Sequence, residues 1–83
     1  MLEKKRQQNE KEYFNWSELE NGGRLYWKKI SAGDSGKTAQ YEKEVDSDEN
    51  TMTFVQKIFD NTGNLLEIHE KFPVDKGHIV LRA

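Results

Sequence analysis

The chain has 83 residues, of which 34% are hydrophobic and 34% are charged, and its formal net charge at pH 7 is −2. This length accommodates one small domain, and the low hydrophobic content predicts a small core. The nearly neutral balance provides no general attraction to polyanions, and the absence of cysteine excludes disulfides, thiolate metal sites and a cysteine nucleophile.

Residues 1–12, MLEKKRQQNEKE, form a charged N-terminal segment. They contain four basic and three acidic side chains, and Leu2 is the one aliphatic residue inside the segment. A helix with so few apolar residues could not bury a face against a core. We therefore expect residues 1–12 to be a frayed helix or a disordered tail, and residues 13–83 to form a single antiparallel β domain.

From Tyr13 onward, apolar residues alternate with polar ones, and short turn signals separate the runs, a pattern typical of an antiparallel meander. Asn21-Gly22 predicts a two-residue hairpin turn before a strand near residues 24–31. Further turns are predicted at residues 46–50 and 60–64, and Pro73 ends the last run. The predicted fold class is mainly β, a meander of four to five strands, and it becomes α+β if an N-terminal helix packs on the sheet.

The last predicted hairpin closes with Asp60 opposite Asn64, so that Ile58 faces Leu66. This register gathers apolar side chains on one face, which we expect to be the core. That face holds Met52, Phe54, Ile58, Leu66, Ile68 and Phe72, with Trp27 or Tyr41 beside it. Such a face needs a cover, and the sequence offers Phe14 with Trp16, the N-terminal segment, the tail Ile79–Leu81 or a second copy of the chain.

Two segments resemble ligand-binding loops but lack residues that those loops need. Residues 33–38, GDSGKT, are similar to the end of a phosphate-binding loop, yet Ser31 stands in place of its first glycine and a strand-like run follows. Residues 46–50 hold the first ligand positions of a calcium-binding loop, but Thr51 and Lys57 occupy the places of its glycine and its last glutamate. We therefore predict neither nucleotide nor calcium binding, and no cofactor.

A polar cluster near the C-terminus contains Glu67, His69 and Lys71, and both histidines of the chain, His69 and His78, fall within it. Strand alternation puts the first three on one face, where a histidine could transfer protons and a lysine could stabilise negative charge. These groups could cleave a phosphodiester without a metal. They could equally form a solvated sheet face. A zinc site from both histidines and a carboxylate lacks local ligand spacing, so no metal site is predicted.

Four aromatic residues could instead form a stacking platform for single-stranded nucleic acid: Tyr26, Trp27, Tyr41 and Phe54. Five acidic residues follow Tyr41, and they would repel a phosphate backbone: Glu42, Glu44, Asp46, Asp48 and Glu49. The sequence therefore favours core packing for the aromatic residues and argues against a nucleic-acid partner.

Five short segments between residues 20 and 80 carry a resemblance to other proteins: Gly22-Gly23-Arg24, Tyr26-Trp27, Tyr41–Asp46, Asp60–Gly63 and Glu67–His78. Together these segments resemble small prokaryotic domains of uncharacterised function. The resemblance implies a free-standing cytoplasmic domain, and it assigns no activity and no site residue. No apolar run approaches the length of a membrane helix and the N-terminus lacks the pattern of a signal peptide, so we also expect a cytoplasmic protein without membrane contact.

Two classes of function remain open from the sequence. The first is a non-enzymatic binding or accessory module, whose partner would be another protein or a second copy of the chain. The second is a metal-independent ribonuclease of bacterial-toxin type that uses Glu67, His69 and Lys71, with His78 or Arg82 within reach of His69. The absence of any complete catalytic motif makes the binding module the primary hypothesis.

Overall fold

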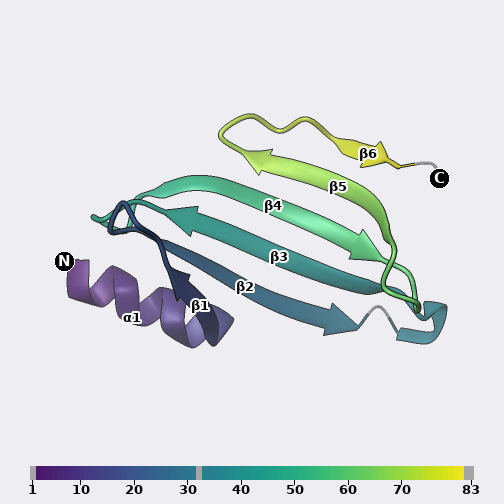
Figure 1. The fold of residues 1–83 in the computed structure, drawn as a ribbon, viewed down its shortest axis with the longest axis horizontal. Coiled ribbons are helices and arrows are strands. Elements are labelled where there is room, and N and C mark those ends of the chain that lie inside the picture. The colour runs from purple at the N-terminus through teal and green to yellow at the C-terminus, as the bar shows by residue number, and fades with distance from the viewer. Residues whose placement is uncertain (1, 32, 82–83) are drawn as a thin grey trace.

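The computed structural model describes residues 2–31 and 33–81, and within them it contains one six-stranded antiparallel sheet with an N-terminal helix (Figure 1). The strands lie in the sheet in the order of the chain, which confirms the predicted mainly β meander. The elements are α1 (Leu2–Tyr13), β1 (Asn15–Glu18), β2 (Arg24–Ser31), the 3₁₀ turn η1 (Gly33–Ser35), β3 (Thr38–Val45), β4 (Thr51–Phe59), β5 (Leu65–Phe72) and β6 (His78–Val80).

Residues 13–72, for which four to five strands were predicted, hold five, and β6 beyond them was not predicted. Its three residues are too few for an alternating pattern, and Pro73 indicated the end of the sheet. The tail was a candidate cover for the apolar face, but it extends the sheet: Ile79 pairs with Ile68, and the Leu81 N–H donates to the Leu66 carbonyl at 2.8 Å.

The turn between β1 and β2 is longer than the predicted two-residue hairpin. Leu19 and Gly23 close it, with the Leu19 N–H donating to the Gly23 carbonyl at 2.9 Å. Gly22 has a φ of 87°, which favours glycine. A Cβ at Gly23 would lie 2.1 Å from the Val45 carbonyl oxygen. The close approach of β3 therefore requires glycine at position 23.

The hairpin between β4 and β5 closes as predicted, with the Asp60 N–H donating to the Asn64 carbonyl at 2.9 Å. The predicted register beyond it was wrong. A bulge between Ile58 and Phe59 shifts the pairing by one residue, so Ile58 lies opposite Glu67 and not Leu66. The turn residues do not encode this bulge.

The bulge redistributes the side chains that were expected to form the core. Phe54 and Ile58 share one face with Glu67 and His69, whereas Ile68 lies on the opposite face. None of the six residues expected on the core face is buried. The expected single apolar face was therefore wrong.

The helix α1 packs on the face that carries Tyr26, Tyr41 and Phe54, at the end of the sheet formed by β1, β2 and β3; we call this the helix face and the other the open face. The core is small and lies under the helix: Tyr13, Tyr26 and Val45 are buried, and Tyr26 and Val45 are fully so. Of the two residues expected beside the core, Tyr41 packs against it, whereas Trp27 lies on the open face. Within the described residues, no helix has the length and apolar character to cross a membrane.

The charged N-terminal segment forms a helix, and of its residues 2–12 only Asn9 is buried. Polar contacts hold this helix on the sheet. Glu49, in the turn between β3 and β4, is only 4% exposed. Its carboxylate accepts hydrogen bonds from the Tyr26 hydroxyl at 2.8 Å, the Asn9 amide at 3.0 Å and the Arg6 guanidinium at 3.2 Å. Three hydrogen-bond donors offset the free-energy cost of burying this charge, so the carboxylate can hold the helix against the sheet.

The same contacts set the ionisation of Glu49. Burial by itself raises the pKa of this carboxyl, but the hydrogen bonds from Asn9, Tyr26 and Arg6 and the Arg6 charge outweigh burial, so the pKa lies below its ordinary value of 4.5. Burial and the bond to Glu49 raise the pKa of Tyr26 to about 12. At neutral pH a carboxylate therefore faces an intact phenol.

We expect Glu49→Gln to lower the free energy of unfolding at neutral pH by about 2 kcal/mol, because the amide leaves Arg6 without its partner and cannot satisfy all three donors. Chemical denaturation measures this difference. The control is Asp48→Asn, which changes an exposed carboxylate in the same turn and should cost less than about 0.5 kcal/mol.

The pH dependence follows from the direction of the pKa shift. Because the folded pKa of Glu49 is below 4.5, the advantage of the native chain over Glu49→Gln is complete above that value and declines as the pH falls through the folded pKa. An equal difference at about pH 7 and about pH 3 would contradict this role of the carboxylate.

Candidate functional site

The structure brings the two histidines together at the edge of the sheet. His69 on β5 lies directly opposite His78 on β6, and their ring centroids are 4.4 Å apart. Each ring has its own carboxylate: His69 Nε2 lies 2.5 Å from Asp75 Oδ1, and His78 Nδ1 lies 3.4 Å from Glu67 Oε1. Arg82, the other residue expected near His69, lies outside the described residues.

The loop between β5 and β6 delivers Asp75 to this cluster. Asp75 Oδ1 also accepts the Gly77 N–H at 2.9 Å, and Gly77 has a φ of 69°, which favours glycine. The hydrogen bond from His69, followed by that from Gly77, lowers the pKa of the Asp75 carboxyl. Asp75 is therefore an ionised partner that orients the His69 ring.

The two imidazoles differ in their access to a ligand. The His69 side chain is 13% exposed, its Nε2 is bound to Asp75, and within the described part of the chain its Nδ1 is buried without a hydrogen-bond partner. The His78 side chain is 50% exposed. Proton transfer requires a nitrogen that the reacting group can reach. His78 can therefore meet a ligand, whereas His69 is enclosed.

Lys71 shares the helix face with Glu67 and His69, as alternation along the strand predicted, but it extends over aromatic rings. Its Nζ lies 5.6 Å from the centre of the Tyr41 ring and 5.8 Å from that of Phe54. These are cation–π distances. Lys71 is therefore part of an aromatic surface that adjoins the histidines.

That surface includes a row of side chains running across the strands from the helix to the sheet edge. Each member lies directly opposite the next on the neighbouring strand: Lys28, Tyr41, Gln56, His69 and His78. The Gln56 amide donates to the Tyr41 hydroxyl at 3.2 Å. At the usual strand spacing, five strands span about 19 Å. We call these five residues the transverse row.

A groove lies beside the transverse row, against the helix. It has a volume of about 290 Å³ and is lined by Tyr13, Lys43, Thr51, Phe54 and Phe72. Three aromatic side chains and one ammonium group thus surround a space that can hold an aromatic group carrying negative charge.

Two of the acids that follow Tyr41 in the sequence, Glu42 and Glu44, do not share its face. Glu42 lies opposite Val55, and Glu44 lies opposite Thr53, because both alternate with Tyr41 and Lys43 along β3. On the open face Glu42 pairs with Lys57 at 3.1 Å. Glu49 is buried under the helix. Three of the five acids that argued against a nucleic-acid ligand are therefore absent from the uncovered part of the helix face, and the absence of such a ligand stays a prediction.

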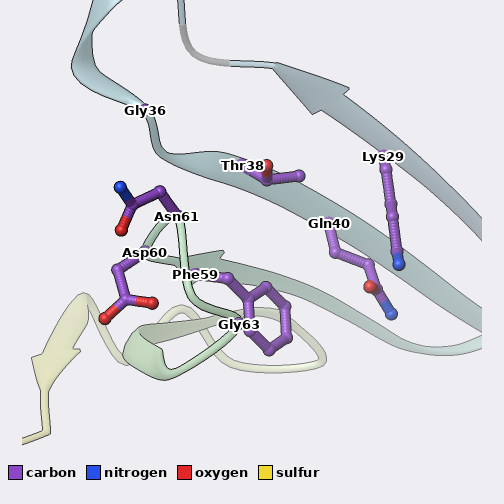
Figure 2. Close-up of a pocket in the computed structure, with 8 residues that line it drawn as sticks. All are labelled: Lys29, Gly36, Thr38, Gln40, Phe59, Asp60, Asn61 and Gly63. Carbon is purple, nitrogen blue, oxygen red and sulfur yellow. The ribbon is translucent and has the colours of Figure 1, made fainter.

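The open face carries a larger hollow of about 570 Å³ at the far end of the sheet. Figure 2 shows Phe59 between two turn residues, Asp60 and Asn61, on one side and the side chains of Lys29 and Gln40 on the other. Gly36 and Thr38, from the GDSGKT segment, complete the wall with Gly63. Since β3 follows this segment, no helix N-terminus faces the hollow, and the phosphate-loop geometry is missing.

Sequence reasoning missed Lys43 and Gln56 on the helix face and Lys29, Gln40 and Phe59 on the open face. These residues come together only through the pairing of neighbouring strands, which the order of residues along one strand does not show. One signal was present in the sequence of β3. Side chains alternate along a strand, so Tyr41 and Lys43 lie on the opposite face from the acids that alternate with them.

Comparisons with models of known families, with curated proteins and with solved structures gave no match for this chain. The resemblance to small prokaryotic domains of uncharacterised function therefore stays a prediction. Across residues 2–31 and 33–81, no three histidine, aspartate or glutamate side chains are grouped so that they could hold a metal ion.

We expect the Asp75 carboxyl to titrate below its ordinary pKa of 3.8, and the pKa to rise toward that value in His69→Ala, because the bond to His69 is the main cause of the shift. Carbon-13 NMR of the side-chain carboxyl measures both values. Asp60 is the internal control: hydrogen bonds within its own turn hold its pKa at about 2, and His69→Ala should leave it there. An unchanged Asp75 titration would show that the two side chains do not interact.

Proposed function

We propose that the chain is a small non-enzymatic binding module whose recognition surface is the part of the helix face that α1 leaves uncovered. The supporting observation is the single-layered sheet: α1 lies beside the β1–β2 end, and no other described element covers β4, β5 or β6 (Figure 1). Exposed aromatic and apolar side chains gathered on one face are typical of an interaction site. A cytoplasmic location is part of the proposal, since a chain without cysteine suits a reducing compartment.

The groove defines the chemistry of the ligand. Phe72, 43% exposed, and Phe54 offer apolar ring surface. Lys43 Nζ is bound to the neutral Asn9 amide oxygen at 2.9 Å, and within the described residues its nearest carboxylate interaction is the longer-range one with Glu12. Rings beside an ammonium group that no carboxylate binds directly favour a ligand that is both aromatic and anionic.

We expect the chain to bind the aromatic anion anilinonaphthalene sulfonate in this groove, and Phe72→Ser to weaken that binding about tenfold, because one wall of the groove is lost. Dye fluorescence during titration measures the affinity. The matched control is Ile79→Ser, which removes a comparably exposed apolar side chain from the open face of β6 and should leave the affinity unchanged.

Circular dichroism should show that both variants unfold at nearly the native temperature, since both replaced side chains are exposed. The native chain failing to bind the dye, or an equal loss in the two variants, would exclude the groove as a recognition surface.

Metal-independent RNA cleavage is the second candidate function, and the observation that favours it is the half-exposed His78 beside Glu67. General acid–base cleavage needs one group to accept a proton and another to donate one. With His69 enclosed, the binding module is better supported. Incubation with RNA in the presence of a chelator decides: cleavage that disappears in His78→Ala would establish the ribonuclease and overturn the non-enzymatic module.

A further inference from the structure

We propose that the ligand of the helix face is single-stranded nucleic acid, bound along the transverse row with the adjoining groove holding one base. This inference rests on the proposed function and specifies its ligand class. It depends on the alternation of rings and cations, on the charge of the helix face, and on the shape of the surface.

Cations and aromatic rings alternate across the strands of the helix face. Lys28 lies opposite Tyr41, and Lys43 lies opposite Phe54. Directly opposite side chains in a sheet are about 5 Å apart at Cβ, so each ring has an ammonium group beside it. Proteins that bind single strands use this combination, in which rings stack on bases and cations contact the backbone phosphates.

The positive charge of the helix face is only partly compensated. Within residues 2–31 and 33–81, neither Lys43 nor Lys71 forms an ion pair: the first is bound to an amide and the second lies over two rings. Lys28 is paired with Glu12 at 2.7 Å.

The carboxylates on this side have bonding partners, but only some of these partners carry a positive charge. Glu10 and Glu18 share the guanidinium of Arg24, whereas Glu67 and Asp75 are bound to histidines, which are charged only if protonated. Attraction for phosphate is therefore expected at Lys43 and Lys71, and not at the histidine edge of the row.

The shape of the surface favours a single strand over a duplex. The rings of Tyr41 and Phe54 stack on each other beside the core, half-buried and with Lys71 over both, so only a base that is unpaired and turned outward can reach them. Gln56 and the exposed His78 add hydrogen-bonding groups along the same row. The row's length of about 19 Å suits two or three stacked bases.

Fluorescence anisotropy of a labelled oligouridylate of about ten nucleotides tests this inference, with the full chain at low salt and with the RNA checked for integrity. We expect saturable binding that weakens about fivefold in Lys71→Gln and in Lys43→Gln. Each of these changes should reduce the slope of log affinity against log salt by about 0.7. Lys29→Gln is the matched control, because it removes the same charge from the open face and should change neither quantity.

The stacking part of the inference has its own readout. Phe72→Ser should weaken oligouridylate binding without changing the salt slope, because it removes ring surface and no charge. A duplex of the same length should bind at least tenfold more weakly than the single strand.

Several results would overturn the inference. The first is an equal loss of RNA affinity in Lys29→Gln and Lys71→Gln, and the second is equal affinity for duplex and single strand. The third is displacement of the RNA by a polyglutamate peptide of equal charge, which would indicate an acidic protein partner. If the native chain binds the aromatic dye through Phe72 but no RNA, this inference fails and the binding module stands. If it binds neither, both fail.

Discussion

The carboxylate of Glu49 lies almost fully buried in the turn between β3 and β4, where it accepts hydrogen bonds from two residues of α1 and from Tyr26 of β2. Burying a charge is costly unless donors surround it, so this turn, the helix and β2 can only come together in an arrangement that satisfies the carboxylate. Two ion pairs, from Arg24 to Glu10 and from Lys28 to Glu12, both at 2.7 Å, also join β2 to α1. A helix without an apolar stripe is thus held on the sheet mainly by polar groups.

This attachment determines what the rest of the sheet can do. Because α1 is fastened at the β1–β3 end, the buried core is confined to Tyr13, Tyr26 and Val45, and β4 to β6 have no covering layer among the described residues. Strands with few buried contacts add little to stability. Their exposed side chains can then serve recognition, and the helix face presents rings and lysines while the acids of β3 point away.

The sequence predicted those parts of the fold that depend on local chemistry. Alternation located the central strands, and the Asp60–Asn64 turn closed as its residues indicated. The bulge at Ile58 was not predictable, because it depends on how whole strands pack and not on the turn, and it reversed the expected core. The contacts of Glu49 join residues about forty positions apart, so a reading along the chain treated this buried carboxylate as a surface acid.

The candidate site, too, was predictable from the sequence only in part. Glu67 and His69 were recognised because they alternate along one strand, and His78 because it is close to them in sequence. The β5–β6 pairing brings them into contact. The pairing of Lys43 with Phe54 and of Gln56 with Tyr41 can be predicted only when the register of the neighbouring strands is known. The absence of a nucleic-acid partner stays a prediction, but two of the acids on which it relied, Glu42 and Glu44, face away from Tyr41, since sequence neighbours on a strand face opposite sides of a sheet.

Ligand binding on the helix face requires that this face is uncovered beyond α1 in the free protein. Relaxation of side-chain protons by a soluble paramagnetic probe, measured by NMR, reports this directly. We expect the ring protons of Phe54 and Phe72 to relax much faster than those of Tyr26 and the methyl protons of Val45, which are fully buried. If Phe54 and Phe72 were as well protected as Tyr26, another layer would cover the face, and the surface proposed here for ligand binding would not exist.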